Sequence, residues 1–74
     1  MRSYIDRLLS ETPLHQDVRL MGAGTPLENP WVFDAGARDL QLLAARGAVD
    51  IVHQQTRSVD GQEVITDLTF RRCR

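Results

Sequence analysis

The dipeptide Asp60-Gly61 is the feature that most constrains what this chain can fold into. Asp-Gly is a preferred pair for a two-residue type I′ turn, because both turn positions need a positive φ. Segments with recurring apolar residues flank the pair on both sides, over residues 49–59 and 62–70. The pattern predicts a C-terminal antiparallel β-hairpin in which Asp60 and Gly61 form the whole loop.

A two-residue loop also fixes the register of the hairpin, and the register sorts its side chains into two faces. On the predicted apolar face, Ile51 lies opposite Phe70 and His53 lies opposite Leu68. The other face is mostly polar. The pairs predicted there are Asp50 with Arg71, Val52 with Thr69, and Gln54 with Asp67.

Hydrophobic spacing predicts two helices and a short strand before the hairpin. Residues 3–11 carry a continuous apolar stripe that ends before Pro13, which indicates a first helix. Residues 17–21 begin with polar and apolar alternation and predict a short strand. Residues 22–30 contain two glycines and two prolines and predict an irregular segment or a single helical turn.

The second predicted helix begins at Asp34, a good N-cap residue, and runs to about Arg46. Gly47 supplies the usual C-terminal stop. Phe33 is expected in the core, and the exposed face of the helix is expected to be polar, small and mildly basic. The elements together predict one α+β domain over residues 1–74.

The overall composition excludes several classes of protein. Hydrophobic residues make up 42% and charged residues 26%, which is typical of a folded globular domain. The net charge of −1 argues against indiscriminate binding of polyanions. The sequence holds no apolar run long enough to cross a bilayer and no signal-peptide pattern, so we expect no membrane partner and a cytoplasmic location.

Motifs of enzymes are missing from the sequence. There is no phosphate-binding glycine loop, no nucleophile elbow and no Cys or His spacing typical of a metal site. His15, His53 and the lone Cys73 do not form a zinc pattern. We therefore expect no catalytic residues, no metal, no cofactor and no small-molecule substrate.

Part of the chain resembles a bacterial winged-helix regulator. The residues that carry the resemblance are Leu40-Gln41-Leu42-Leu43-Ala44-Ala45-Arg46-Gly47-Ala48-Val49, then Val59-Asp60-Gly61-Gln62-Glu63-Val64, and Leu68-Thr69. In that family a recognition helix passes through an Arg-Gly step into a β-hairpin wing. The resemblance covers less than half of the chain, and it implies a small winged-helix-like domain that binds duplex DNA as a dimer and regulates transcription.

The same resemblance implies which residues contact DNA. The helix over residues 35–46 would enter the major groove, where Arg38 and Gln41 would reach base edges. Arg46 and Arg57 would contact phosphates.

Some features depart from the family pattern. Residues 22–30 replace the helix expected before the recognition helix, the hairpin tip carries Asp60 and Glu63, and the chain has no lysine. The acidic tip and the missing lysines weaken the attraction to phosphate.

The alternative is a module that binds another protein on the same frame. Trp31 belongs to a residue type enriched in interface hot spots, and the proline-bracketed loop before it could present it to a partner. The hairpin face would complete that surface, and Arg71 and Arg72 would contact an acidic partner. DNA, another protein and a second copy of the chain remain open as partners at this point.

Overall fold

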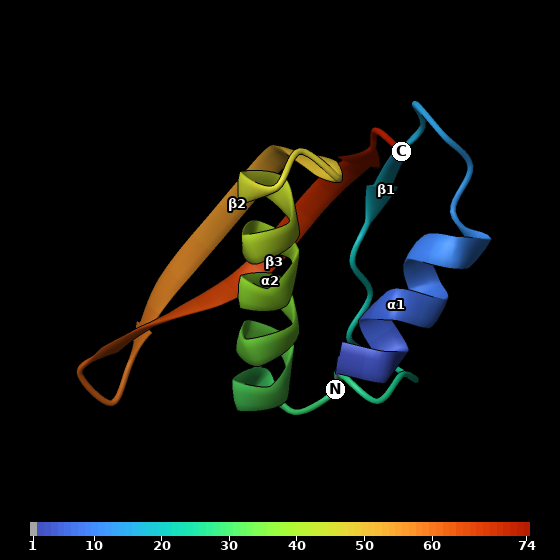
Figure 1. Cartoon of the computed structure of the whole chain (residues 1–74). Helices are drawn as coiled ribbons and strands as arrows, with labels where there is room; N and C mark the ends of the chain where they lie inside the picture. Colours follow the sequence, from blue (N-terminus) through green and yellow to red (C-terminus); the bar gives the residue numbers. More distant parts are fainter. Residues whose placement is uncertain (1) are drawn as a thin grey trace.

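Three antiparallel strands form the sheet, in the order β1-β3-β2, and the longer helix α2 lies across the hairpin (Figure 1). The structure is a computed structural model and describes residues 2–74. The elements are α1 (Arg2–Glu11), β1 (Asp17–Arg19), α2 (Pro30–Ala45), β2 (Val49–Val59) and β3 (Gln62–Arg72). The predicted α+β order is thereby confirmed. No helix in the described residues is long and apolar enough to cross a membrane.

The two-residue turn at Asp60-Gly61 is confirmed. Asp60 has a φ of 51° and Gly61 a φ of 79°, the positive values that a type I′ turn needs. The predicted register holds at both ends of the hairpin. Asp50 pairs with Arg71 at the open end, and Val59 pairs with Gln62 beside the turn.

The middle of the hairpin differs from the prediction because it contains two register shifts. The first lies between Ile51 and His53, and the second lies between Gln55 and Thr56. The predicted pairs of His53 with Leu68, Val52 with Thr69 and Gln54 with Asp67 are therefore wrong. The observed pairs are His53 with Thr69, Gln54 with Leu68, and Gln55 with Asp67.

These bulges change which side chains reach the core. His53, predicted on the apolar face, is exposed, and so is Thr66, which the uninterrupted register places on the same face. Ile65, which the uninterrupted register placed on the polar face, is buried. A β-bulge adds one residue to one strand, so the residues beyond it face the opposite side of the sheet from the one that simple alternation predicts. This change of side explains why His53 and Thr66 are exposed and Ile65 is buried.

Helix α2 begins earlier than predicted. Its N-cap is Asn29, whose side chain accepts a hydrogen bond from the Trp31 backbone N–H at 2.9 Å, and Pro30 occupies the first turn. Proline suits that position because its missing N–H would be unpaired there anyway. The Asn-Pro step that resembles a helix breaker is thus the helix start, and Asp34 lies inside the helix. Gly47 ends the helix with a φ of 77°, as predicted.

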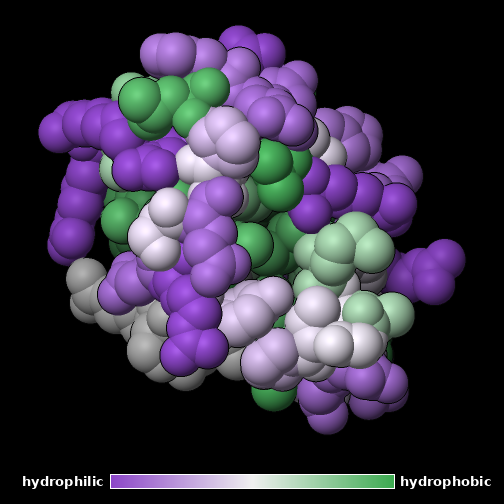
Figure 2. All heavy atoms as spheres, turned by 90° about the vertical axis from the view of Figure 1, so that its right-hand side faces the viewer, coloured by the Kyte–Doolittle hydropathy of each residue, from purple (hydrophilic) through white to green (hydrophobic). Residues whose placement is uncertain are grey.

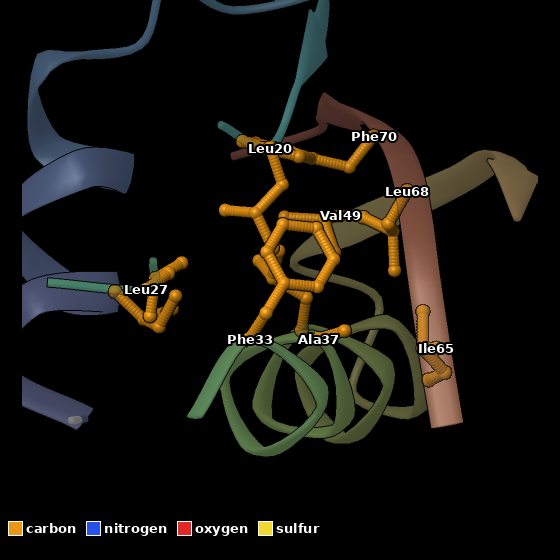
Figure 3. Packing of buried hydrophobic residues seen from close by; sticks show 10 residues of the cluster. Leu20, Leu27, Phe33, Ala37, Val49, Ile65, Leu68 and Phe70 are labelled. Atoms are coloured by element: carbon orange, nitrogen blue, oxygen red, sulfur yellow. The ribbon is translucent and has the colours of Figure 1, made fainter. Parts of the chain in front are cut away.

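The core lies between α2 and β3, and other segments close it. Phe33 of α2 is buried, as are Leu68 and Phe70 of β3 (Figure 3). Leu40 of α2 is also buried. Ile5, Leu20, Leu27, Ala37, Val49 and Ile65 complete the cluster. The prediction that Phe33 belongs to the core is confirmed.

The short strand β1 leaves much of the outer edge of β3 without a strand partner. β1 pairs with β3 only from Asp17 to Arg19, and the Leu20 backbone N–H adds one bond to the Leu68 carbonyl at 2.8 Å.

From residue 21 to Asn29 the chain forms turns, which confirms that this segment is irregular. Figure 2 shows the side of the molecule turned toward α1, where hydrophilic residues surround hydrophobic atoms at the centre.

Gly36 allows α2 to approach the rest of the core closely. A Cβ at this position would lie 3.1 Å from Cδ2 of Leu27 and 3.5 Å from Cδ1 of Ile5. Gly36→Val should lower the free energy of unfolding by about 1–3 kcal/mol through overpacking, measured by urea denaturation. The exposed neighbour Ala35 is the control, since Ala35→Val should cost only about 0.5 kcal/mol through helix propensity. Equal losses in both variants would contradict a tight contact at Gly36.

Candidate interaction surface

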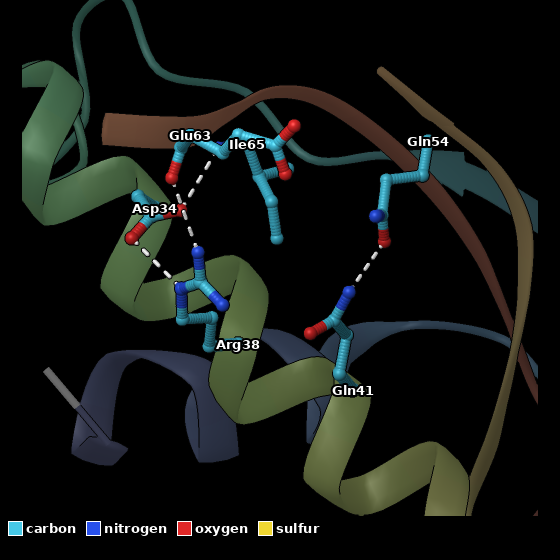
Figure 4. Close-up of polar contacts among 6 residues, drawn as sticks. All are labelled: Asp34, Arg38, Gln41, Gln54, Glu63 and Ile65. Carbon is cyan, nitrogen blue, oxygen red and sulfur yellow. Dashed lines mark hydrogen bonds and ion pairs between the residues drawn. The ribbon is translucent and has the colours of Figure 1, made fainter. Parts of the chain in front are cut away.

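Asp34 and Arg38 join α2 to the outer edge of β3 (Figure 4). Oδ1 of Asp34 accepts a hydrogen bond from the Ile65 backbone N–H at 2.8 Å. Oδ2 of the same carboxylate accepts from Nε of Arg38 at 2.9 Å, and Nη2 of Arg38 donates to the Glu63 carbonyl at 3.3 Å. One ion pair on the helix therefore satisfies a backbone donor and a backbone acceptor on the strand.

Asp34 and Arg38 thereby bond to backbone groups of β3 that β1 is too short to pair with. Glu63 and Ile65 are two residues apart, so their backbone groups point to the same edge of β3. An unpaired sheet edge is a site for unwanted pairing with other chains. Asp34 and Arg38 therefore protect this edge of the sheet, and Arg38 is less free to reach a base edge than the sequence predicts.

The carboxylate of Asp34 is held in its charged form. Partial burial alone would raise the pKa of Asp34, but the hydrogen bonds from Arg38 and the Ile65 N–H, with the charge of Arg38, lower it below its ordinary value. The Asp34 side chain is 16% exposed, so solvent screens these contacts only in part.

Gln41 is also engaged inside the molecule. Its Nε2 donates to Oε1 of Gln54 on β2 at 2.6 Å, and the Gln41 side chain is half-buried (Figure 4). The bulge after Ile51 makes this contact possible, because it turns Gln54 rather than His53 toward α2. The two residues predicted to contact bases, Arg38 and Gln41, thus lie together beside the hairpin, and both bond to it.

The solvent-facing side of α2 is more apolar than the sequence predicts. Trp31 is 44% exposed and Leu42 is 63% exposed, and Ala35 and Ala45 are exposed between and after them. With Arg38 these residues form the α2 stripe, at positions 31, 35, 38, 42 and 45. Steps of four and three residues keep side chains on one side of a helix, so the α2 stripe is a continuous surface.

The remaining predicted DNA contacts lie apart from each other. Arg46 is exposed just after the end of α2, and Arg57 is exposed on the outer half of β2. Neither takes part in an ion pair among the described residues. They are separate charges rather than one basic patch.

Arg71 and Arg72, predicted to contact a protein partner, are tied to the rest of the fold. Nε of Arg71 donates to Oδ1 of Asp17 at 2.7 Å, and this contact raises the pKa of Arg71. Nη1 of Arg72 donates to the Thr12 carbonyl at 2.9 Å. Both side chains fasten β3 to the N-terminal part of the chain, while the Trp31 side chain is still available for contact.

A cleft of about 370 Å³ lies between the irregular segment and β3. Leu20, Leu27, Phe33 and Ile65 are among the apolar residues that line it. None of the residues predicted as sites lies in it. Residues 2–74 contain no group of three His, Cys, Asp or Glu side chains close enough to hold a metal ion.

Comparisons with family models, with curated proteins and with solved structures found no match. The geometry of the chain itself is therefore the basis for assigning a function. The sequence pattern alone predicted a polar, small and mildly basic exposed face, and it missed the exposure of Leu42 on the same side of α2 as Trp31. Extending the helix back to Pro30 would have revealed the spacing that links the two residues.

The bonds of Asp34 generate a prediction about acid stability. Asp34→Asn at pH 6 should lower the free energy of unfolding by about 1–2 kcal/mol, because a charge-assisted bond to Arg38 is lost. Since the folded-state pKa is depressed, the contribution of Asp34 is complete above its ordinary value of 3.8 and is lost as pH falls through the lower folded value.

The variant should accordingly lose less stability than the wild type as the pH falls from about 5 to about 2.5, as followed by urea denaturation at each pH. Asp39→Asn, on the same helix, controls for the loss of one negative charge. An unchanged pH profile in Asp34→Asn would contradict the role given to this carboxylate.

A second prediction concerns the thiol of Cys73. Partial burial raises the pKa of Cys73, and the neighbouring Asp50 carboxylate raises it further, against the opposing charges of Arg71 and Arg74. A raised pKa leaves less thiolate at about pH 8, so iodoacetamide should alkylate the folded chain more slowly than the urea-unfolded chain. Asp50→Asn should speed the reaction and Asp6→Asn should not, as measured by mass spectrometry. Equal rates in all three folded proteins would contradict the assignment.

Proposed function

We propose that the chain is a non-enzymatic binding module with a winged-helix-like frame, and that it holds a protein partner on the α2 stripe. The observation that carries this proposal is the exposure of Trp31 and Leu42 on one side of α2, with Ala35 and Arg38 between them and Ala45 after them. Large apolar side chains grouped on a surface favour association, because a partner removes their area from water. Trp is also enriched among residues that dominate binding energy.

The order of elements supports the winged-helix-like part of the proposal. Helix α2 ends at Arg46-Gly47 and runs directly into the β2-β3 hairpin, the order that the resemblance describes. The departure is the irregular segment before α2, where the family has a helix. The frame is therefore proposed as a reduced form, in which Asn29 and Pro30 start the long helix directly.

The polar contacts of α2 favour a protein over DNA as the partner. Arg38 is bound to Asp34 and β3, and Gln41 is bound to Gln54. A recognition helix needs free donors and acceptors on its exposed side. The α2 stripe offers Trp31 and Leu42 instead, and neither side chain can make the bidentate hydrogen bonds that distinguish base pairs.

Duplex DNA is the second candidate, and one observation favours it. Arg46 and Arg57 are exposed at opposite ends of the α2-hairpin unit and have no ion-pair partner in the part of the chain that the structure describes. Charges in such positions suit phosphate contacts. A reduced winged-helix regulator that binds DNA as a dimer would use them.

Paired variants of the α2 stripe test the leading proposal. Tagged protein is crosslinked in an extract of its source cells, and captured proteins are identified by mass spectrometry. The double variant Trp31→Ala with Leu42→Ala should reduce the amount of specific partner captured by more than about tenfold, since hot-spot truncation costs about 2 kcal/mol or more. Leu14→Ala with Met21→Ala is the matched control, because both residues are about equally exposed elsewhere. If Trp31→Ala with Leu42→Ala still captures the partner as the wild type does, the proposal is wrong.

A salt series distinguishes the second candidate. Duplex binding that depends on Arg46 and Arg57 should weaken steeply between about 50 and 200 mM salt, because released counterions carry the affinity. Gel shifts with Arg46→Ala plus Arg57→Ala should show the loss, whereas Trp31→Ala should leave binding unchanged. Absence of a shift by the wild type at about 50 mM salt excludes duplex DNA as the partner.

A further inference from the structure

β2 is the long open edge of the sheet. It contains 11 residues, and within residues 2–74 its single neighbouring strand is β3, while β1 at the opposite edge has only 3 residues. Ion pairs join β1 to β3, where Arg19 bonds to Asp67 and Arg71 bonds to Asp17. The side chains of β2 are exposed without interruption from residue 52 to 58, and Val52 is 46% exposed.

The contacts of α2 show which way the backbone groups of β2 point. Glu63 and Ile65 of β3 are paired with Ser58 and Thr56 of β2, yet their backbone groups bond to Arg38 and Asp34. These are therefore pairs that do not hydrogen-bond across the hairpin. It follows that the N–H and C=O groups of Thr56 and Ser58 point away from β3, out of the open edge.

The outer half of β2 is regular and poorly defended against pairing. Residues 53–59 run consecutively through the pairing, because the second bulge adds its extra residue to β3. Native edge strands are usually protected by lysine, proline or inward-pointing charge. β2 contains neither lysine nor proline, and Arg57 is the one charged side chain between Val52 and Val59.

We propose that this edge pairs with β2 of a second copy of the chain, antiparallel, about a two-fold axis at Thr56. Thr56 then lies opposite its own copy, Gln54 opposite Ser58, and Gln55 opposite Arg57. Threonine pairs are favourable across strands, the Gln55 amide oxygen can accept a hydrogen bond from the Arg57 guanidinium, and no like charges face each other directly. The outward groups of Gln54, Thr56 and Ser58 supply the hydrogen bonds.

A second copy fits this edge better than an unrelated strand because the segment complements itself. Arg57 is the one charged side chain of residues 54–58, so a basic partner strand would be repelled and an acidic one would find a single complementary charge. Small cores also gain from association, since about 3–5 kcal/mol of stability is common for a domain of this size. The two-fold axis is perpendicular to the sheet, so both α2 helices lie on the same face of the combined sheet.

The test compares Thr56→Pro with Thr56→Ala. Proline removes the outward N–H of Thr56 and leaves the bonds to β3 intact, whereas alanine keeps that N–H. Sedimentation and light scattering should give twice the chain mass of 8.4 kDa for the wild type and Thr56→Ala. Thr56→Pro should give the monomer mass. Circular dichroism checks that Thr56→Pro stays folded.

Hydrogen exchange gives an independent measurement that needs no variant. The Thr56 and Ser58 amides should be protected at high protein concentration and lose most of that protection on dilution. A wild type that stays monomeric up to millimolar concentration overturns the proposal, as does fast exchange of both amides. Trp31→Ala with Leu42→Ala should keep the dimer mass. A halved mass there would overturn pairing along β2 and mean that copies associate through the α2 stripe.

Discussion

The bond between the Asp34 carboxylate and the Ile65 N–H sets how α2 sits on the hairpin. Apolar packing alone tolerates small rotations of a helix, whereas hydrogen bonds require defined distances and angles. Asp34, Arg38 and Gln41 bond to the hairpin at successive turns of α2. With the rotation fixed in this way, Phe33 points into the core and Trp31 points to solvent. The exposed apolar surface is thus a consequence of the polar contacts beside it.

The hairpin and its turn could be predicted because their causes are local. A positive φ at Asp60 and Gly61 is a property of two adjacent residues, and it fixes the pairing near the turn. The bulges could not be predicted, since they depend on how β3 must twist to place both Ile65 and Leu68 against α2. The alternation of apolar and polar residues along one strand carries no information about the twist that this packing requires.

The sequence predicted where the residues of the candidate site lie, but not which hydrogen bonds they make. The sequence placed Arg38, Gln41 and Trp31 on or beside the second helix, and the structure has all three there. Starting the helix at Asp34 hid the fact that Asp34 faces a strand 31 residues away in the chain. A long-range bond of this kind leaves no periodic signal. It is also what converts Arg38 from a free charge into a structural contact.

The part of β3 that extends beyond β1 differs from the outer edge of β2 in how its backbone groups are satisfied, and this difference relates the fold to the proposed binding. On β3, side chains of α2 satisfy the backbone groups of Glu63 and Ile65. On β2, the outward groups of Thr56 and Ser58 face the open edge. If a second copy pairs there, the dimer presents two α2 stripes on one face. Once a partner with two matching sites has bound one α2 stripe, the dimer holds the second stripe close to the second site. The apparent affinity of the partner for the dimer then rises without any new contact. Pairing along β2 would therefore strengthen binding at α2.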